Sequence, residues 1–111
     1  MNISSTQHGT ITVVAVSGRI DTTNYTEFEE QVVALISAEK KRFVFDFSKL
    51  EYLSSAGLRA LLKIGQELGD AGGELAYASV SEYIDDIFKI AGFSKVYKFY
   101  DTPAAAIQFL G

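Results

Sequence analysis

The sequence predicts one α/β domain, because strand-like and helix-like segments alternate along the chain. Stretches of strand length, rich in apolar or β-branched residues, occur at residues 10–17, 42–47 and 75–78. Each is followed by a short turn and a segment with apolar residues at helical spacing. Such alternation is typical of a parallel or mixed sheet covered by helices. We expect a single domain over residues 1–111, since this length can bury one core.

The first third of the chain predicts a hairpin followed by a helix. Residues 10–17 form a strand in this prediction, and residues 1–7 can pair with it. A helix is expected to begin near Thr23 or Asn24 and to close at residues 39–41. Its buried face would consist of four apolar residues at helical spacing: Phe28, Val32, Leu35 and Ile36.

The central segment predicts a buried strand, a short polar turn and the start of a helix. Residues 42–47 are almost continuously apolar, as expected of a strand covered on both faces. After the turn, a helix is expected from about Ser55 to Asp70, closed by residues 72–73. Its leucines recur at helical spacing: Leu58, Leu61, Leu62 and Leu68.

The last third predicts two further strands and two further helices. Residues 75–78 form a strand, and residues 79–82 have the spacing of a capping box. The helix that this box begins is expected to stop at Gly92. Residues 96–100 predict a short strand, and Pro103 is placed to open the last helix.

Composition and charge exclude several classes of function. The net charge of −4 provides no basic face, so direct nucleic-acid binding is not expected. The absence of cysteine excludes disulfides and thiolate metal sites, and no cluster of metal-ligating residues appears. No basic leader or apolar run of about 20 residues is present, which predicts a cytoplasmic protein without membrane insertion.

The polar groups that could act in a site come together, in this prediction, at one end of the sheet. Ser54 and Ser55 fall at or beside a helix N-cap, where free N–H groups and the helix dipole favour negative charge. Asp21 follows one strand, and Asp46 is expected to end the central strand. The alternative is purely structural: either serine can simply cap the helix, and both aspartates can serve turns.

The same central segment resembles the signature of STAS domains, the family of bacterial anti-sigma factor antagonists. The pattern of the family is approximately Asp-(Leu/Phe)-Ser-x-(Leu/Val)-x-(Tyr/Phe)-(Leu/Ile/Met)-Asp-Ser-(Ser/Thr/Ala)-Gly-Leu. The matching positions here are Asp46, Phe47, Ser48, Leu50, Tyr52, Leu53, Ser55, Gly57 and Leu58. The resemblance covers essentially the whole chain and implies a STAS-like fold, a mixed sheet with helices packed mainly on one face.

The resemblance also implies a function, that of a binding module and not an enzyme, with no cofactor of its own. Ser55 occupies the position that is phosphorylated in the family, and Asp21 in Gly-Arg-Ile-Asp is similar to an acidic position beside it. The partner implied is an anti-sigma factor that is also an ATP-dependent serine kinase, and a metal-dependent serine phosphatase would reverse the modification. The implied partner-binding residues are Asp21, Ser54, Ser55, Ala56, Gly57 and Leu58, with Asp46 and Ser48 in support.

Two positions depart from the family pattern. Ser54 stands where the best-known antagonists carry aspartate, and Ala56 replaces a serine or threonine. These changes bear on the rate of phosphorylation and the choice of kinase more than on the fold. For Gly57 two interpretations stay open, since it can let a partner approach closely or merely relieve crowding in the first helical turn.

Two rival functions follow from the same residues. The chain could be a standalone STAS subunit of a transporter or signalling assembly, such as a lipid-transport system, with Ser55 serving structure alone. A small enzyme or nucleotide-binding protein could instead use Asp21, Asp46 and Ser55. No phosphate-binding loop and no general base other than carboxylates accompany these residues, which disfavours the second rival.

Overall fold

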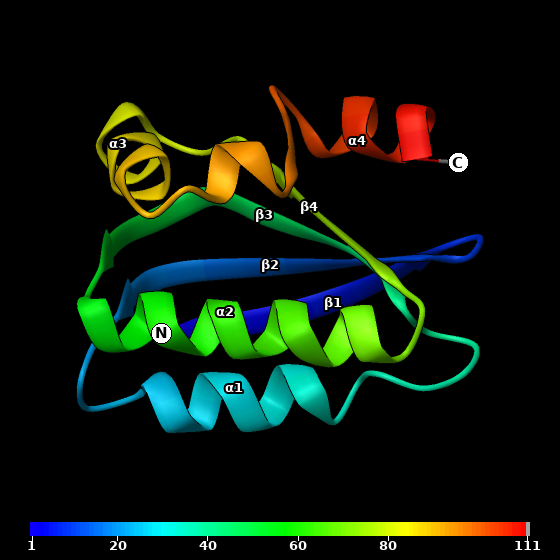
Figure 1. Ribbon diagram of the computed structural model, residues 1–111, viewed down its shortest axis with the longest axis horizontal. Coiled ribbons are helices and arrows are strands. Elements are labelled where there is room, and N and C mark those ends of the chain that lie inside the picture. Colours follow the sequence, from blue (N-terminus) through cyan, green and yellow to red (C-terminus); the bar gives the residue numbers. More distant parts are fainter. Residues whose placement is uncertain (111) are drawn as a thin grey trace.

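The described part of the chain, residues 1–110 of a computed structural model, is built around one mixed sheet. Its strands lie in the order β1-β2-β3-β4-β5, and Figure 1 labels the first four. β1 is antiparallel to β2, and all other neighbouring strands are parallel. The strands are β1 (Asn2–His8), β2 (Ile11–Ile20), β3 (Arg42–Leu53), β4 (Glu74–Ala78) and β5 (Lys98–Tyr100). The predicted mixed sheet and its hairpin are confirmed.

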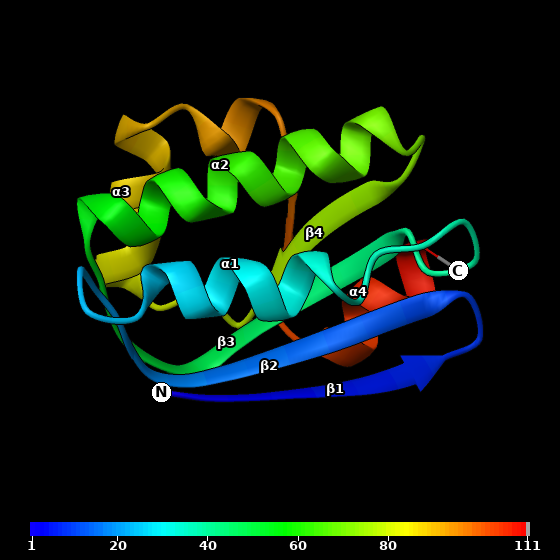
Figure 2. The same cartoon turned by 90° about the horizontal axis from the view of Figure 1, so that it is seen from below.

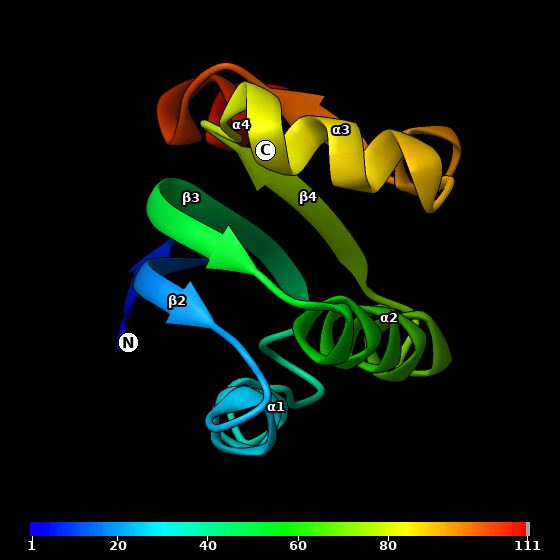
Figure 3. The same cartoon turned by 90° about the vertical axis from the view of Figure 1, so that its left-hand side faces the viewer.

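Helices cover the two faces of the sheet unequally, as expected. α1 (Tyr25–Val33), α2 (Ser55–Asp70) and α3 (Glu82–Ile90) pack on one face, and a single 3₁₀ turn, η1 (Phe93–Lys95), follows α3. α4 (Pro103–Leu110) packs on the other face. In Figure 2, α1 and α2 lie in front of the sheet and α4 behind it, and Figure 3 shows the same arrangement along the strands.

The apolar character of the central strands reflects burial on both faces. On β3, Phe43, Phe45 and Phe47 contribute to the core beneath α1, α2 and α3, whereas Val44 contributes to the core beneath α4. Tyr77 on β4 joins the larger core, stacked against Phe45 with ring centroids 5.7 Å apart. Successive strand residues point to opposite faces, so a strand between two helical layers is apolar at nearly every position.

The predicted polar turn after Asp46 is wrong, because β3 continues to Leu53. Its register against β2 shifts twice, after the pair Ala15–Asp46 and after the pair Gly18–Leu50, and each shift leaves one extra residue in β3. Such a bulge bends a strand and redirects the side chains that follow. Leu50 and Leu53 thus return to the main core, and polar residues at the bulge imitate a turn in the sequence.

Two helix boundaries also differ from expectation. α1 ends at Val33, so Leu35 and Ile36 pack against the core from the loop that follows. α3 is capped by Ser81, whose Oγ accepts from the backbone N–H of Ile84 at 3.3 Å. The capping box predicted at Ser79 is therefore wrong.

Ser79 is used for a different purpose. It has a positive φ of 58°, and its Oγ donates to the carbonyl of Asp101 at 3.1 Å. This hydrogen bond joins the end of β4 to the segment after β5. The local sequence allows either serine to cap the helix, and the tertiary contact decides between them.

We expect Tyr77→Phe to raise the free energy of unfolding by about 1 kcal/mol, because it removes a polar group that has no protein partner. The Tyr77 hydroxyl is fully buried, has no hydrogen-bond partner within residues 1–110, and burial raises its pKa well above the usual value. Urea denaturation of both proteins measures the difference, and Tyr97→Phe, at a half-buried ring, serves as a control with little expected change. A less stable Tyr77→Phe protein would contradict the prediction.

Candidate functional site

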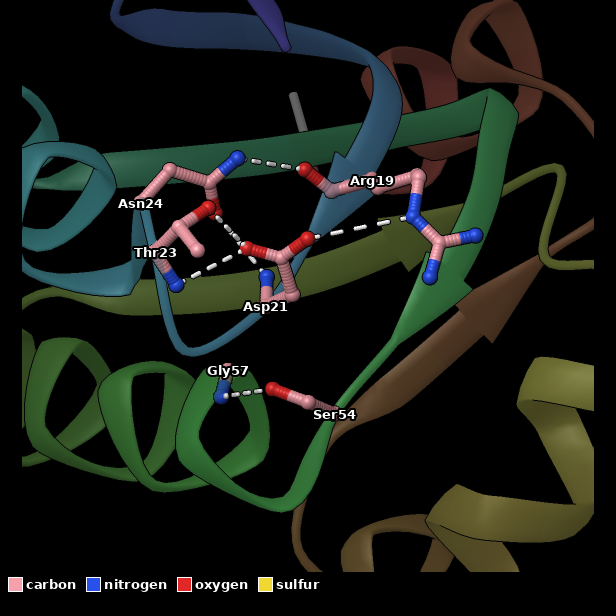
Figure 4. A network of polar contacts seen from close by, with 6 residues as sticks. All are labelled: Arg19, Asp21, Thr23, Asn24, Ser54 and Gly57. Atoms are coloured by element: carbon pink, nitrogen blue, oxygen red, sulfur yellow. Dashed lines mark hydrogen bonds and ion pairs between the residues drawn. The ribbon is translucent and has the colours of Figure 1, made fainter.

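The two serines at the start of α2 have different structural roles. Ser54 is the N-cap: its Oγ accepts from the N–H of Gly57 at 3.1 Å (Figure 4). Its carbonyl accepts from the N–H of Leu58 at 2.9 Å. Ser55 is the first residue of the helix, and its side chain is exposed. Its hydroxyl has no hydrogen-bond partner in residues 1–110. The capping interpretation therefore applies to Ser54, and the Ser55 hydroxyl is accessible.

Asp21 is held as a carboxylate in the loop after β2. Its Oδ1 accepts from both the hydroxyl and the backbone N–H of Thr23, at 2.6 and 2.9 Å. Its Oδ2 lies 3.8 Å from Nε of Arg19. The two hydrogen bonds from Thr23, followed by the charge of Arg19, lower the pKa of Asp21 below its usual 3.8. The site therefore carries a negative charge at neutral pH.

The Asp21 loop is fixed beside the start of α2. The carbonyl of Ile20 accepts from the N–H of Ser54 at 2.9 Å, which joins the ends of β2 and β3. Asn24 closes the loop: its Oδ1 accepts from the N–H of Asp21 and its Nδ2 donates to the carbonyl of Arg19. As Figure 4 shows, the structure thus brings Asp21 and the first turn of α2 together, as expected for the carboxyl ends of neighbouring parallel strands.

We expect Asp21→Asn to lower the free energy of unfolding only at pH values where the Asp21 carboxyl group is ionised. The folded-state pKa is lowered, so the stabilising contribution is present above the unfolded pKa, near 3.8. It is lost as the pH falls through the lowered folded pKa. Urea denaturation should therefore show a less stable variant at neutral pH and nearly equal proteins in strong acid; an equal difference at both would contradict this interpretation.

Three of the residues expected to bind a partner around Ser55 are partly or fully buried. Ala56 and Gly57 are buried, and Leu58 is half-buried against the main core. A Cβ atom at Gly57 would lie 2.8 Å from side-chain atoms of both Ile20 and Leu53. The interpretation of Gly57 as relief of crowding is therefore favoured, and of the residues from 55 to 58 only Ser55 is exposed.

The structure does not bring Asp46 and Ser48 to this site, which corrects the expectation that Asp46 ends the central strand. Asp46 lies within β3, and its Oδ1 accepts from the N–H of Ser48 at 3.0 Å. Both residues line a separate hollow of about 230 Å³ together with residues of β1 and β2. Asp46 lies two positions after Val44 on β3, so both side chains are on the same face of the sheet. That face is the one covered by α4, whereas α2 covers the other.

Sequence reasoning missed three residues near the site. The guanidinium of Arg19 lies 4.2 Å from the centre of the Tyr52 ring, as well as beside Asp21. On α2, Arg59 is exposed, and Leu62, expected among the periodic leucines, has 41% of its surface exposed. The spacing of 55, 59 and 62 places three exposed residues on one helical face, a signal that could have been read from the sequence.

Other possible site types have no support in the described part of the chain. Between residues 1 and 110, no three His, Cys, Asp or Glu side chains gather as metal ligands would. None of the helices in that range has the length and apolar character needed to cross a bilayer. What the arrangement offers chemically is an exposed hydroxyl at a helix N-terminus, close to a fixed carboxylate.

Comparison with known proteins gives consistent results. The sequence model of the STAS domain matches residues 2–106. BtrV of Bordetella bronchiseptica, by its name a candidate anti-sigma factor antagonist, is 28% identical over 94 residues, covering 85% of this chain and 81% of that protein. The crystal structure of an anti-sigma factor antagonist from Mycobacterium paratuberculosis has a TM-score of 0.85 and 25% identity, covering 96% of this chain and 91% of that one.

The same fold also occurs in a transport protein. The murine anion transporter Solute Carrier 26 family member A9 contains it with a TM-score of 0.78 and 13% identity, over 94% of this chain and 18% of the transporter chain. Identity at this level indicates a shared fold only.

Proposed function

We propose that this chain, which belongs to the STAS domain family, is an anti-sigma factor antagonist switched by phosphorylation of Ser55. In its unmodified form it would bind and sequester an anti-sigma factor that is also a serine kinase, and so free a sigma factor. A metal-dependent serine phosphatase would restore the binding form. The observation that carries the proposal is the division of roles at α2, where Ser54 caps the helix and leaves the Ser55 hydroxyl exposed.

The chemistry of the switch belongs to the partner. The kinase would transfer the γ-phosphoryl group of ATP to Oγ of Ser55, a base on the kinase would take the hydroxyl proton, and ADP would leave. This chain acts as substrate and binding module and needs no cofactor. Phosphorylation would add approximately −1.5 to −2 charges at neutral pH.

The position of Ser55 explains how such a charge could change binding without unfolding the domain. At the first position of α2, the helix dipole and the N–H groups of the first turn favour negative charge. The ionised Asp21 lies in the loop bonded to this helix start, so phosphorylation would concentrate negative charge on one small surface. A partner surface that accommodates one carboxylate would reject the added phosphate by like-charge repulsion and desolvation.

Phosphosite mapping by intact mass and peptide mass spectrometry tests the proposal. The protein is purified from its native cells under growth and stress conditions, with and without phosphatase treatment. We expect one phosphate on Ser55 that phosphatase removes, and a Ser55→Ala protein that is not modified. Phosphate on a different residue, or none under any condition, would contradict the proposal.

A second candidate function is a STAS subunit that binds a transporter constitutively. The fold is compatible with this role, since it also occurs within an anion transporter. In that case affinity purification should recover a membrane protein, and Ser55→Asp should leave this complex intact.

A further inference from the structure

A positively charged side chain lies one helical turn from the proposed phosphorylation site. Arg59 follows Ser55 by four residues on α2, and both side chains are exposed on the same helical face. The Arg59 guanidinium forms no ion pair with any residue from 1 to 110. Lys63, one turn further along, pairs with Glu29 of α1 at 3.5 Å. Arg59 is thus the available cation on this face of α2 within the described residues.

We propose that Arg59 binds the phosphate on Ser55 once that serine is modified, and so is withdrawn from the partner-binding surface. This inference rests on the proposed function, since it requires phosphorylation of Ser55. The switch would then consist of two linked changes, a new negative charge at Ser55 and the loss of a free positive charge at Arg59.

The helix geometry favours this contact. Side chains four residues apart are neighbours on a helix surface, and the order with the acidic group nearer the N-terminus is the more favourable one. Cα–Cβ bonds tilt toward the helix N-terminus, which directs Arg59 back toward Ser55. A guanidinium can donate two parallel hydrogen bonds to a phosphate, so the interaction is stronger than that of an isolated point charge.

Arg19 is the competing cation, and its present contacts make it the weaker candidate. It lies 3.8 Å from Asp21 and 4.2 Å from the centre of the Tyr52 ring. To bind the phosphate, Arg19 would have to break at least its ion pair with Asp21. Arg59 gives up no ion pair within the described residues.

In the unmodified protein, Arg59 can pair instead with a carboxylate of the partner. The exposed Leu62 on the same face supplies an apolar contact beside it. After phosphorylation, Arg59 would pair with the phosphate of its own chain. The carboxylate of the partner would then be left unpaired at the interface. Unpaired buried charges weaken complexes more than the loss of the pair alone would.

A titration of the phosphate tests the contact independently of any kinase. Phosphoserine is inserted at position 55 during translation, and its ³¹P NMR shift is followed with pH in the parent, Arg59→Gln, Arg59→Lys, Arg19→Gln and Lys63→Gln proteins. We expect the phosphate pKa to be higher in Arg59→Gln than in the parent by about 0.3 to 0.5 unit. Arg59→Lys should restore part of the difference.

Lys63→Gln and Arg19→Gln are controls that show whether a change in the phosphate pKa comes from Arg59 or from another cation. Lys63→Gln removes the same charge from the same helix about 12 Å from Ser55 along the axis, and should leave the phosphate pKa nearly unchanged. An unchanged pKa in Arg59→Gln, or a full shift in Arg19→Gln, would overturn the proposal. If phosphosite mapping finds no phosphate on Ser55 while the inserted phosphate still responds to Arg59→Gln, the proposed function fails and the contact itself stands.

Discussion

Ser55→Asp is expected to abolish most binding to the proposed partner kinase while leaving the domain folded. The side chain would place a permanent negative charge at the exposed start of α2, beside the ionised Asp21. A negative charge that meets the partner's surface without a cation of the partner to pair with it costs about 2 to 4 kcal/mol, or roughly a thirty-fold to thousand-fold loss of affinity. Isothermal titration with the kinase recovered from native cells measures this loss.

Ser55→Asn is the matched control for that experiment, because asparagine has nearly the size of aspartate without its charge. It should retain most of the affinity, and Ser55→Ala should bind at least as well while resisting phosphorylation. Aspartate in the first helical turn is favoured by the dipole, by about 0.3 to 1 kcal/mol, so the Asp protein should unfold no earlier than the parent. Equal weakening by Asp and Asn would indicate loss of contact and not repulsion.

Much of the fold could be predicted because hydrophobic periodicity changes clearly along this chain. The helix from Ser55 to Asp70 and the strand at residues 75–78 were predicted close to their observed bounds, since both are strongly patterned and end at glycine or turn residues. The end of β3 could not be predicted, because the bulge after Asp46 is set by pairing with β2, which lies far away in sequence.

The site could be predicted in part from the order of the strands. Asp21 and the paired serines follow neighbouring parallel strands, so the topology alone brings them together. Which serine caps α2 depends on the local geometry, and the sequence left both possibilities open until the structure assigned the cap to Ser54. Asp46 lies at the end of an apolar run, and no pattern in the sequence signals the bulge that carries β3 beyond it.

The end of α2 yields the largest expected effect on stability. The helix closes through two hydrogen bonds, from the N–H of Gly72 to the carbonyl of Gly69 and from the N–H of Gly73 to the carbonyl of Leu68. This pattern is the Schellman motif, and Gly72 takes the positive φ, 75°, that the motif requires. Gly73 then turns the chain into β4, where Glu74 donates to the carbonyl of Lys41 at 2.8 Å.

Gly73→Ala is expected to lower the free energy of unfolding by about 2 to 3 kcal/mol, since its Cβ would overlap the backbone carbonyl oxygen of Lys41. That carbonyl precedes β3 and cannot move without disturbing the pairing of Arg42 with Glu74. Urea denaturation followed by circular dichroism measures the change.

Gly69→Ala, at the same end of α2, is expected to change the free energy of unfolding in the opposite direction. Comparing the two variants separates the cost of steric overlap from the gain in helix propensity. A Cβ at Gly69 meets no atom within 4 Å, and the residue is exposed within α2. Alanine there should stabilise the domain by about 1 kcal/mol, because it restricts the unfolded chain and favours the helix. Because Ser55 lies at the far end of α2, neither substitution should change phosphorylation of the folded protein. A Gly73→Ala protein as stable as Gly69→Ala would show that Lys41 can move aside freely, and that β3 and β4 are less tightly joined at this end than the structure indicates.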